Sequence, residues 1–171
     1  MDFMIRKATL DDAAAIAHVQ VESWKTTYAG IVPDAFLDSM STEVQAQNWQ
    51  TWFAADTVLI FVVEDETGIF GFASGGRIRE ALGDYDAELY AIYLLHQRQR
   101  QHAGRMLSQT LASALHASGF KSMLVWVLEA NPAVSFYKRL GAIPISQKII
   151  EIGGVDLPEL AFGWPSLDRL I

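Results

Sequence analysis

The 171-residue chain contains no cysteine, which excludes disulfides, thiolate metal sites and a cysteine-bound acyl intermediate. It also has no apolar run near the roughly 18 residues that a membrane span needs. The start, Met1–Lys7, lacks the basic segment and following apolar stretch of a secretory signal. We therefore expect a cytoplasmic protein with no membrane partner.

Linkers, internal repeats and low-complexity stretches are also missing, so we expect a single domain over residues 1–171. Apolar residues make up 51% of the chain and charged residues 19%, which is the composition of a globular protein. The formal net charge of −7 argues against general nucleic-acid binding.

Acidic residues are absent from one long segment, the 40 residues between Glu88 and Glu129. This segment carries a charge of +4, and the rest of the chain carries −11. The four bases are Arg98, Arg100, Arg105 and Lys121. A basic island in an acidic protein suggests an anionic ligand, and the alternative is a chance cluster on a solvated helix face.

Hydrophobic periodicity predicts an α/β protein with a mixed, mostly antiparallel central sheet and helices on both faces. Strands are expected over 3–7, 57–63, 69–74, 86–95, 123–128, 143–152 and 155–162. Helices are expected over 9–28, 33–39 and 42–54, from about 103 to Gly119, and from Asn131 to about Leu140. Gly153-Gly154 should form the tight turn of a last hairpin.

The strand over 86–95 leads through a basic loop into a helix, and this segment carries the chemistry. Strict alternation would place Leu89, Ala91 and Tyr93 on one face of the strand, and Glu88, Tyr90, Ile92 and Leu94 on the other. The first amides of the following helix lack intrahelical partners, so they can bind phosphate. Gly104 would let the backbone approach it, and Arg98, Arg100 and Arg105 could add charge. An ordinary strand–loop–helix connection is the alternative.

Two motifs in this half of the chain resemble those of the GNAT superfamily of acyl-CoA-dependent N-acyltransferases. Gln99-Arg100-Gln101-His102-Ala103-Gly104 resembles the family's phosphate loop, Gln/Arg-x-x-Gly-x-Gly/Ala, and residues 131–142 look like its second acyl-CoA motif. The order of elements also agrees from Met4 to Trp164. His102 replaces the usual first glycine, so we expect weaker or differently arranged phosphate binding. His96 and His102 lack metal-ligand spacing, and we expect no metal.

The resemblance implies acetyl-CoA as co-substrate and assigns its contacts. The pantetheine arm would bond to the backbone of Ile92, Tyr93 and Leu94, and Asn131 would contact the arm where two strands splay apart. The Leu94 amide would polarise the thioester carbonyl. The pyrophosphate would sit on the loop formed by Gln99, Arg100, Gln101, His102, Ala103, Gly104 and Arg105.

Direct attack of an amine on the thioester is the expected mechanism, because cysteine and a Gly-x-Ser-x-Gly elbow are both absent. Glu88, eleven residues before Gln99, stands where some relatives have a catalytic glutamate, so it is the candidate base. A Glu paired with a nearby Arg, or a water chain in place of Glu88, are the alternatives. Tyr137 is the candidate acid, and a half-buried helix aromatic is the alternative.

The acceptor is predicted to be a primary amine of a small molecule, with Trp24, Tyr28 and Ile31 as walls of its site. Scattered acidic residues favour a cationic, polyamine-like amine. Two other functions stay open, an acetyltransferase acting on a protein or peptide and a non-catalytic acyl-CoA-binding module. The last hairpin and several tryptophans are compatible with a homodimer.

Overall fold

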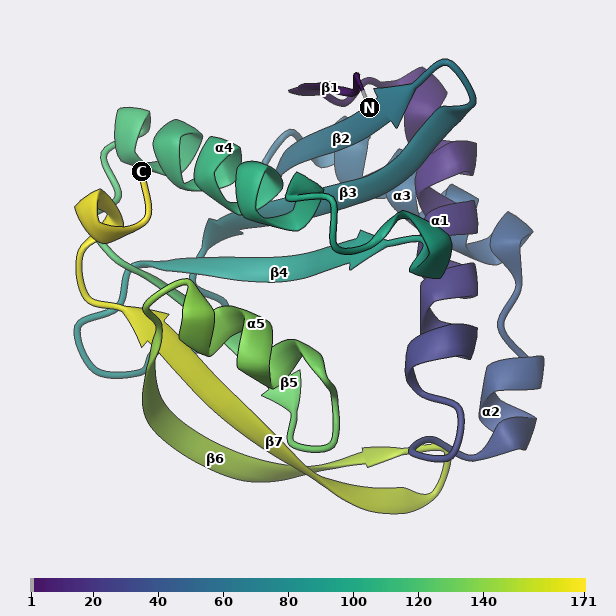
Figure 1. Ribbon diagram of the computed structural model, residues 1–171. Helices are drawn as coiled ribbons and strands as arrows, with labels where there is room; N and C mark the ends of the chain where they lie inside the picture. Colours follow the sequence, from purple (N-terminus) through teal and green to yellow (C-terminus); the bar gives the residue numbers. More distant parts are fainter. Residues whose placement is uncertain (1) are drawn as a thin grey trace.

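A seven-stranded sheet forms the centre of the computed structural model, which describes residues 2–171 (Figure 1). The strand order is β1-β2-β3-β4-β5-β7-β6. β4 and β5 run parallel and the other neighbours run antiparallel, which confirms the predicted mixed sheet. The strands are β1 Met4–Lys7, β2 Leu59–Asp65, β3 Gly68–Arg77, β4 Ala87–Leu94, β5 Met123–Leu128, β6 Ile143–Ile152 and β7 Val155–Trp164.

Helices cover both faces of the sheet, as predicted. α4 and α5 lie on one face, and α1 and α3 cover β2, β3 and β4 on the other (Figure 1). The helices are α1 Ala13–Thr27, α2 Asp34–Asp38, α3 Thr42–Ala55, α4 Ala103–Ala117 and α5 Ala133–Arg139. None of the helices within residues 2–171 combines the length and apolar composition that a membrane crossing requires.

The apolar ridge of α4 fixes the basic loop at the end of β4. Leu107, Leu111 and Leu115 are fully buried against the sheet. Burying each of these side chains stabilises the fold by roughly 1.5–3 kcal/mol. α4 ends at Ala117, and the predicted glycine stop follows at Gly119, whose φ of +94° suits glycine. The first turn of α4 is therefore held firmly beside the last residues of β4.

A bulge in β4 breaks the predicted alternation of side chains. The pairing with β3 shifts between Leu89 and Ala91, so Tyr90 is an extra residue in β4. Leu89 consequently packs on the α4 face together with Ile92 and Leu94, whereas Ala91 and Tyr93 pack on the α1 face. The expectation that Leu89 shares a face with Ala91 and Tyr93 is wrong, because one extra residue reverses the period-two pattern.

β4 and β5 pair over only three residues before they separate. The ladder runs from Ala87 beside Met123 to Leu89 beside Val125. β5 instead continues along β7, up to the pair of Leu128 and Glu159. The sheet therefore opens between β4 and β5 on the carboxyl side of the bulge, which is where α/β proteins bind ligands.

The basic loop is tied to the turn between β2 and β3. Arg98 forms an ion pair with Asp65, stacks on Phe70 with its guanidinium carbon 4.1 Å from the ring centroid, and donates to Thr67 Oγ1 at 3.3 Å. Asp65 also accepts bonds from the Thr67 N–H and hydroxyl. Hydrogen bonds from Arg98 and Thr67 lower the pKa of Asp65 to about 2.

We expect Asp65→Asn to make the free energy of unfolding less dependent on pH in the acidic range. The folded-state pKa of Asp65, about 2, lies below its usual value of 3.8. The ionised carboxylate therefore stabilises the fold above pH 3.8, and this stabilisation is lost as the pH falls toward 2. Between these pH values the free energy of unfolding should fall less in the variant than in the wild type. Denaturant unfolding across this range measures it. Glu66→Gln, in the same turn and exposed, is the control. An equal change of unfolding free energy with pH in Asp65→Asn and the wild type would contradict the prediction.

Candidate active site

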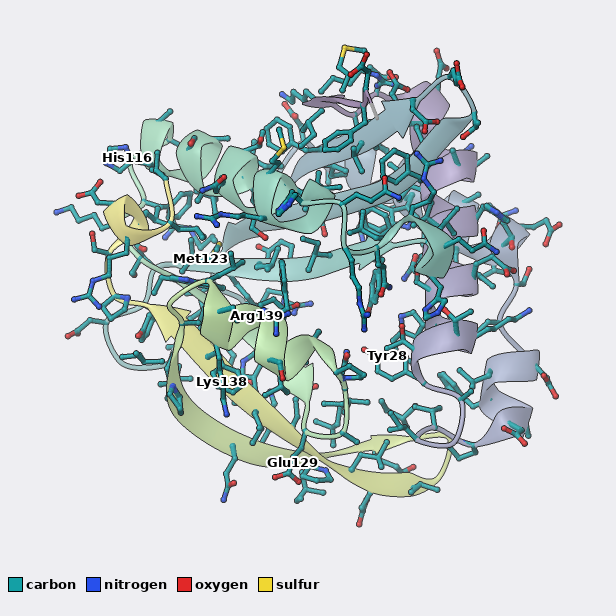
Figure 2. The ribbon with its side chains drawn as sticks, viewed as in Figure 1. Tyr28, His116, Met123, Glu129, Lys138 and Arg139 are labelled. Carbon is teal, nitrogen blue, oxygen red and sulfur yellow. The ribbon has the colours of Figure 1, made fainter. Side chains whose placement is uncertain are left out.

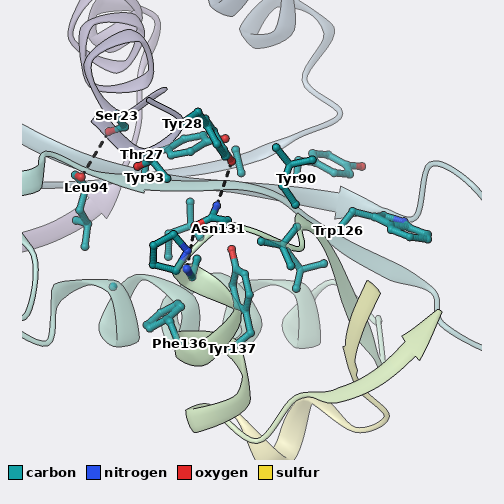
Figure 3. Close-up of a pocket in the computed structure, with 18 of the residues that line it drawn as sticks. Ser23, Thr27, Tyr28, Tyr90, Tyr93, Leu94, Trp126, Asn131, Phe136 and Tyr137 are labelled. Carbon is teal, nitrogen blue, oxygen red and sulfur yellow. Dashed lines mark hydrogen bonds between the residues drawn. The ribbon is translucent and has the colours of Figure 1, made fainter. Parts of the chain in front are cut away.

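A cavity of about 1420 Å³ occupies the opening between β4 and β5 (Figure 3). Its walls come from the end of α1, the loop before α4, α5 and the β6–β7 hairpin. The cavity brings together these residues that the sequence singled out: Trp24, Tyr28, Glu88, Ile92, Tyr93, Leu94, Gln99, Arg100, His102, Gly104, Arg105, Asn131 and Tyr137.

Besides Arg98, three predicted site residues lie outside the cavity lining. Ile31 packs against the cluster of Tyr28 and Val32, and Ala103, the first residue of α4, is buried in the core. The Gln101 side chain turns inward, and its Oε1 is buried without a hydrogen-bond partner among residues 2–171. These residues therefore shape the walls from behind.

The loop before α4 presents a row of free backbone amides. Within residues 2–171, the N–H groups from Arg100 to Arg105 donate to no other group. Arg100 and His102 have φ values of +63° and +65°, with a residue of negative φ between them. Such alternation turns successive N–H groups toward one point and creates an anion-binding concavity. The positive end of the α4 dipole adds to it.

A side chain at position 104 would crowd its neighbours at this site. A Cβ on Gly104 would lie 3.3 Å from Leu94 Cδ1 and 3.3 Å from Phe136 Cζ. The glycine thus lets the first turn of α4 sit close to β4 and α5. This gives the position a role in helix–strand packing in addition to any contact with a ligand.

Basic side chains surround the amide row, but they are not all the predicted ones. Arg100 and Arg105 line the cavity, and Arg139 of α5 joins them. Figure 2 shows Arg139 on α5. Arg98 lies outside the lining because Asp65 holds it. The expectation that Arg98 faces an anion is therefore wrong, whereas Arg139 was missed although it lies inside the second motif.

The edge of β4 that faces the opening carries backbone N–H groups that the β3 ladder does not use. Leu95 donates to Phe70 O at 2.9 Å, which makes Tyr93 and Phe72 the next hydrogen-bonded pair of the antiparallel ladder. The N–H groups of Ile92 and Leu94 consequently point away from β3, into the opening. Tyr93 differs from the prediction, since its peptide groups belong to the ladder and only its side chain reaches the cavity.

Asn131 joins the two sides of the opening. Its Oδ1 accepts from the Ala133 N–H at 2.8 Å, which starts α5, and its Nδ2 donates to the Tyr28 hydroxyl at 3.1 Å. Tyr28 lies at the end of α1, toward β5 and α5 (Figure 2). Asn131 retains one N–H for a ligand, because an amide nitrogen has two.

Three tyrosines meet at the opening from different elements. Tyr28 and Tyr93 approach from the α1 face and Tyr137 from α5 (Figure 3). Burial raises the pKa of each phenol, most strongly for Tyr93 and Tyr137. These hydroxyls therefore stay protonated at neutral pH and can donate hydrogen bonds or a proton.

Glu88 is buried and paired. Its carboxylate forms an ion pair with Arg79 and accepts from the Arg79 N–H at 3.2 Å and from Nε at 3.1 Å. Arg79 also stacks on Tyr90, with its guanidinium carbon 4.6 Å from the ring centroid. Pairing with an Arg was the alternative to catalysis at Glu88, and the structure contains that pair.

Several residues of the acceptor side were not singled out from the sequence. They are Arg79, Tyr90, Trp126, Lys148 and Glu159, which all line the cavity. The sequence did not single them out because four of them lie on separate strands, Arg79 lies between β3 and β4, and the five share no local motif. Among residues 2–171, no group of three or more His, Asp or Glu side chains is placed to hold a metal.

Comparison with known sequences gives two matches. Residues 20–142 match the acetyltransferase (GNAT) family. The chain is also 44% identical over 167 residues to the uncharacterized N-acetyltransferase YuaI of Bacillus subtilis, covering 97% of this chain and 95% of that protein.

Solved structures share the fold at lower identity. The PaiA N-acetyltransferase of Thermoplasma acidophilum, in complex with coenzyme A, superposes with a TM-score of 0.73 at 22% identity, covering 94% of this chain and 98% of that one. YncA of Salmonella typhimurium, a putative acetyltransferase with acetyl-CoA, gives a TM-score of 0.74 at 21% identity, covering 98% and 95%.

Replacement of His102 should reveal backbone strain in the loop. A left-handed conformation costs a residue with a Cβ about 1–2 kcal/mol, and glycine avoids this cost. We expect His102→Gly to be more stable than His102→Ala by about 1 kcal/mol. Urea unfolding of both variants measures the difference. An alanine variant as stable as the glycine variant would show that the loop relaxes out of this conformation.

Proposed function

Because the chain belongs to the GNAT family and is an N-acetyltransferase, we propose that its acceptor is the primary amine of a small, cationic molecule and that acetyl-CoA is its acetyl donor. One observation carries the donor assignment. The unpartnered amides from Arg100 to Arg105 open into the same cavity as the free edge of β4.

The residues present fit acetyl-CoA. The amide row with Arg100, Arg105 and Arg139 suits a diphosphate, since backbone N–H groups at a helix start and guanidinium groups both bind phosphate oxygens. The amides of Ile92 and Leu94 suit the amide-bearing arm that follows. When bound, acetyl-CoA supplies an acetyl group activated as a thioester.

Tyr137 is the proposed general acid. Its phenol is 5% exposed, faces the opening, and has a pKa raised by burial, so it is protonated when the thiolate departs. The Tyr137 hydroxyl would donate a hydrogen bond to the sulfur and transfer its proton as the C–S bond breaks, and the phenolate would take up the proton that the attacking nitrogen loses on becoming an amide. The Leu94 amide points into the same opening and is the proposed donor to the thioester carbonyl.

Glu88 is the proposed base for the attacking ammonium. It is buried at the start of the opening, and both of its carboxylate oxygens contact Arg79. The proton transfer therefore requires that the Arg79 contact loosen and free a carboxylate oxygen for the ammonium. Arg79 has an exposed side chain, which leaves it free to turn outward.

The acceptor would enter from the face opposite α5. Trp24 and Tyr28 form its wall on the α1 side, and the buried Trp24 Nε1 has no hydrogen-bond partner among residues 2–171. Three carboxylates line this side, Glu80, Glu88 and Glu159, against the cations Arg79 and Lys148. An excess of negative charge favours a cationic acceptor.

The proposal predicts both coenzyme binding and amine-dependent thiol release. Titration calorimetry with acetyl-CoA should give saturable heat, and free thiol should appear with a panel of small amines. Binding without thiol release from any amine or peptide would support a non-catalytic module instead. Release with peptides alone would identify a protein acetyltransferase and overturn the small-amine acceptor.

Tyr137→Phe should lower kcat roughly 100-fold, because the thiolate loses its proton donor. Coenzyme affinity should stay near the wild-type value, since the ring still packs against Trp164. Tyr90→Phe is the matched control, because Tyr90 also lines the cavity but its hydroxyl donates to Arg77 O. Wild-type turnover in Tyr137→Phe would exclude Tyr137 as the acid.

A further inference from the structure

The acceptor side of the cavity is built on one face of the sheet. Glu88 of β4 pairs with Leu124 of β5. At the other end of β5, Leu128 pairs with Glu159 of β7, and Glu159 pairs with Lys148 of β6. Paired residues share a face, and alternate residues along a strand do as well. Glu88, Trp126, Glu159 and Lys148 consequently project from the face opposite α5.

Glu159 is an incompletely paired carboxylate on this face. Its side chain is only 16% exposed, yet no hydrogen bond to it forms among residues 2–171. Its one close cation is Lys148 Nζ, at 3.8 Å. Glu88 differs, because Arg79 supplies its carboxylate with several hydrogen bonds. Burying a carboxylate without a donor is costly, which points to a donor supplied by a ligand.

The charged neighbours of Glu159 do not donate a hydrogen bond to its carboxylate. Lys148 lies 4.0 Å from the Trp126 ring centroid and donates to Glu80 at 3.4 Å, so Glu159 shares this ammonium with Glu80 and lies 3.8 Å from it, beyond hydrogen-bond distance. Arg79 is engaged by Glu88 and acts on Glu159 only at longer range, while the Glu88 charge opposes it. Desolvation raises the pKa of Glu159, as expected for a carboxylate short of partners.

Tyr28 connects the surroundings of Glu159 to those of α5. It packs in one cluster with Leu128, which pairs with Glu159 at the end of β5 farthest from the β4 ladder. Its hydroxyl accepts from Asn131, just before α5, the helix that carries Tyr137. An amine positioned for attack beside Tyr137 would therefore leave Glu159 to a second group of the same acceptor.

We propose that Glu159 determines specificity by binding a second ammonium group, so that short diamines are preferred to monoamines as acceptors. This inference rests on the proposed function, because it concerns the acceptor end of the same cavity. An ammonium group offers three donors to a carboxylate that has none, and Trp24 and Tyr28 would pack against the methylenes between the two nitrogens.

Binding of 1,4-diaminobutane and of butylamine to protein saturated with coenzyme A tests the proposal, because no acetyl group is present to turn over. We expect calorimetry to show at least about tenfold tighter binding of the diamine to the wild type, the usual size of a charge-assisted hydrogen bond. Glu159→Gln should lose this preference and bind butylamine as before. Glu151→Gln, exposed on β6 and outside the cavity lining, is the matched control and should keep it.

The outcomes separate this inference from the proposed function. Equal affinities of the wild type for both amines, binding of neither, or a preference kept in Glu159→Gln would each overturn the role of Glu159. In those cases thiol release with other amines would still test the acetyltransferase proposal. Unchanged coenzyme affinity and unfolding temperature verify the fold of Glu159→Gln, and the wild-type comparison alone suffices if that variant does not fold.

Discussion

The site depends on one interruption of backbone hydrogen bonding. After three paired residues, β5 leaves β4 and follows β7, and the peptide groups of Ile92 and Leu94 lose the strand that would have satisfied them. The loop before α4 adds a second unsatisfied row, from Arg100 to Arg105. Unpaired peptide groups are costly in a folded protein unless water or a ligand binds them. The fold thus concentrates that cost along one groove, where a long polar ligand can remove it.

Packing on both faces keeps the interruption open. On one face the leucine ridge of α4 and Gly104 hold the loop against β4. On the other face Ile16, Ala17 and Val19 of α1 bury against the sheet and place Tyr28 at the opening. The tyrosine hydroxyls meet where no continuous strand lies between the faces. Because burial keeps these phenols neutral, they supply donors without adding negative charge beside an anionic ligand.

Local patterns in the sequence were enough for most of the fold. The strands, the helices, the Gly153-Gly154 turn and the helix start near Gly104 follow from periodicity and turn chemistry, and the structure contains them. Non-local contacts were not predictable. The bulge at Tyr90 depends on the partner strand, and Arg98 is withdrawn by Asp65, 33 residues earlier. Glu159 could not be singled out because its surroundings include β5, a strand distant from it in sequence.

The cavity is lined from both faces of the sheet, by the loop before α4 and by α5 on one face and by the end of α1 on the other. A donor lying beside α4 and α5 and an acceptor arriving past α1 would therefore approach the opening from different faces. Such an arrangement suits a reaction in which both molecules are held together at once, with no side chain carrying the acetyl group between them.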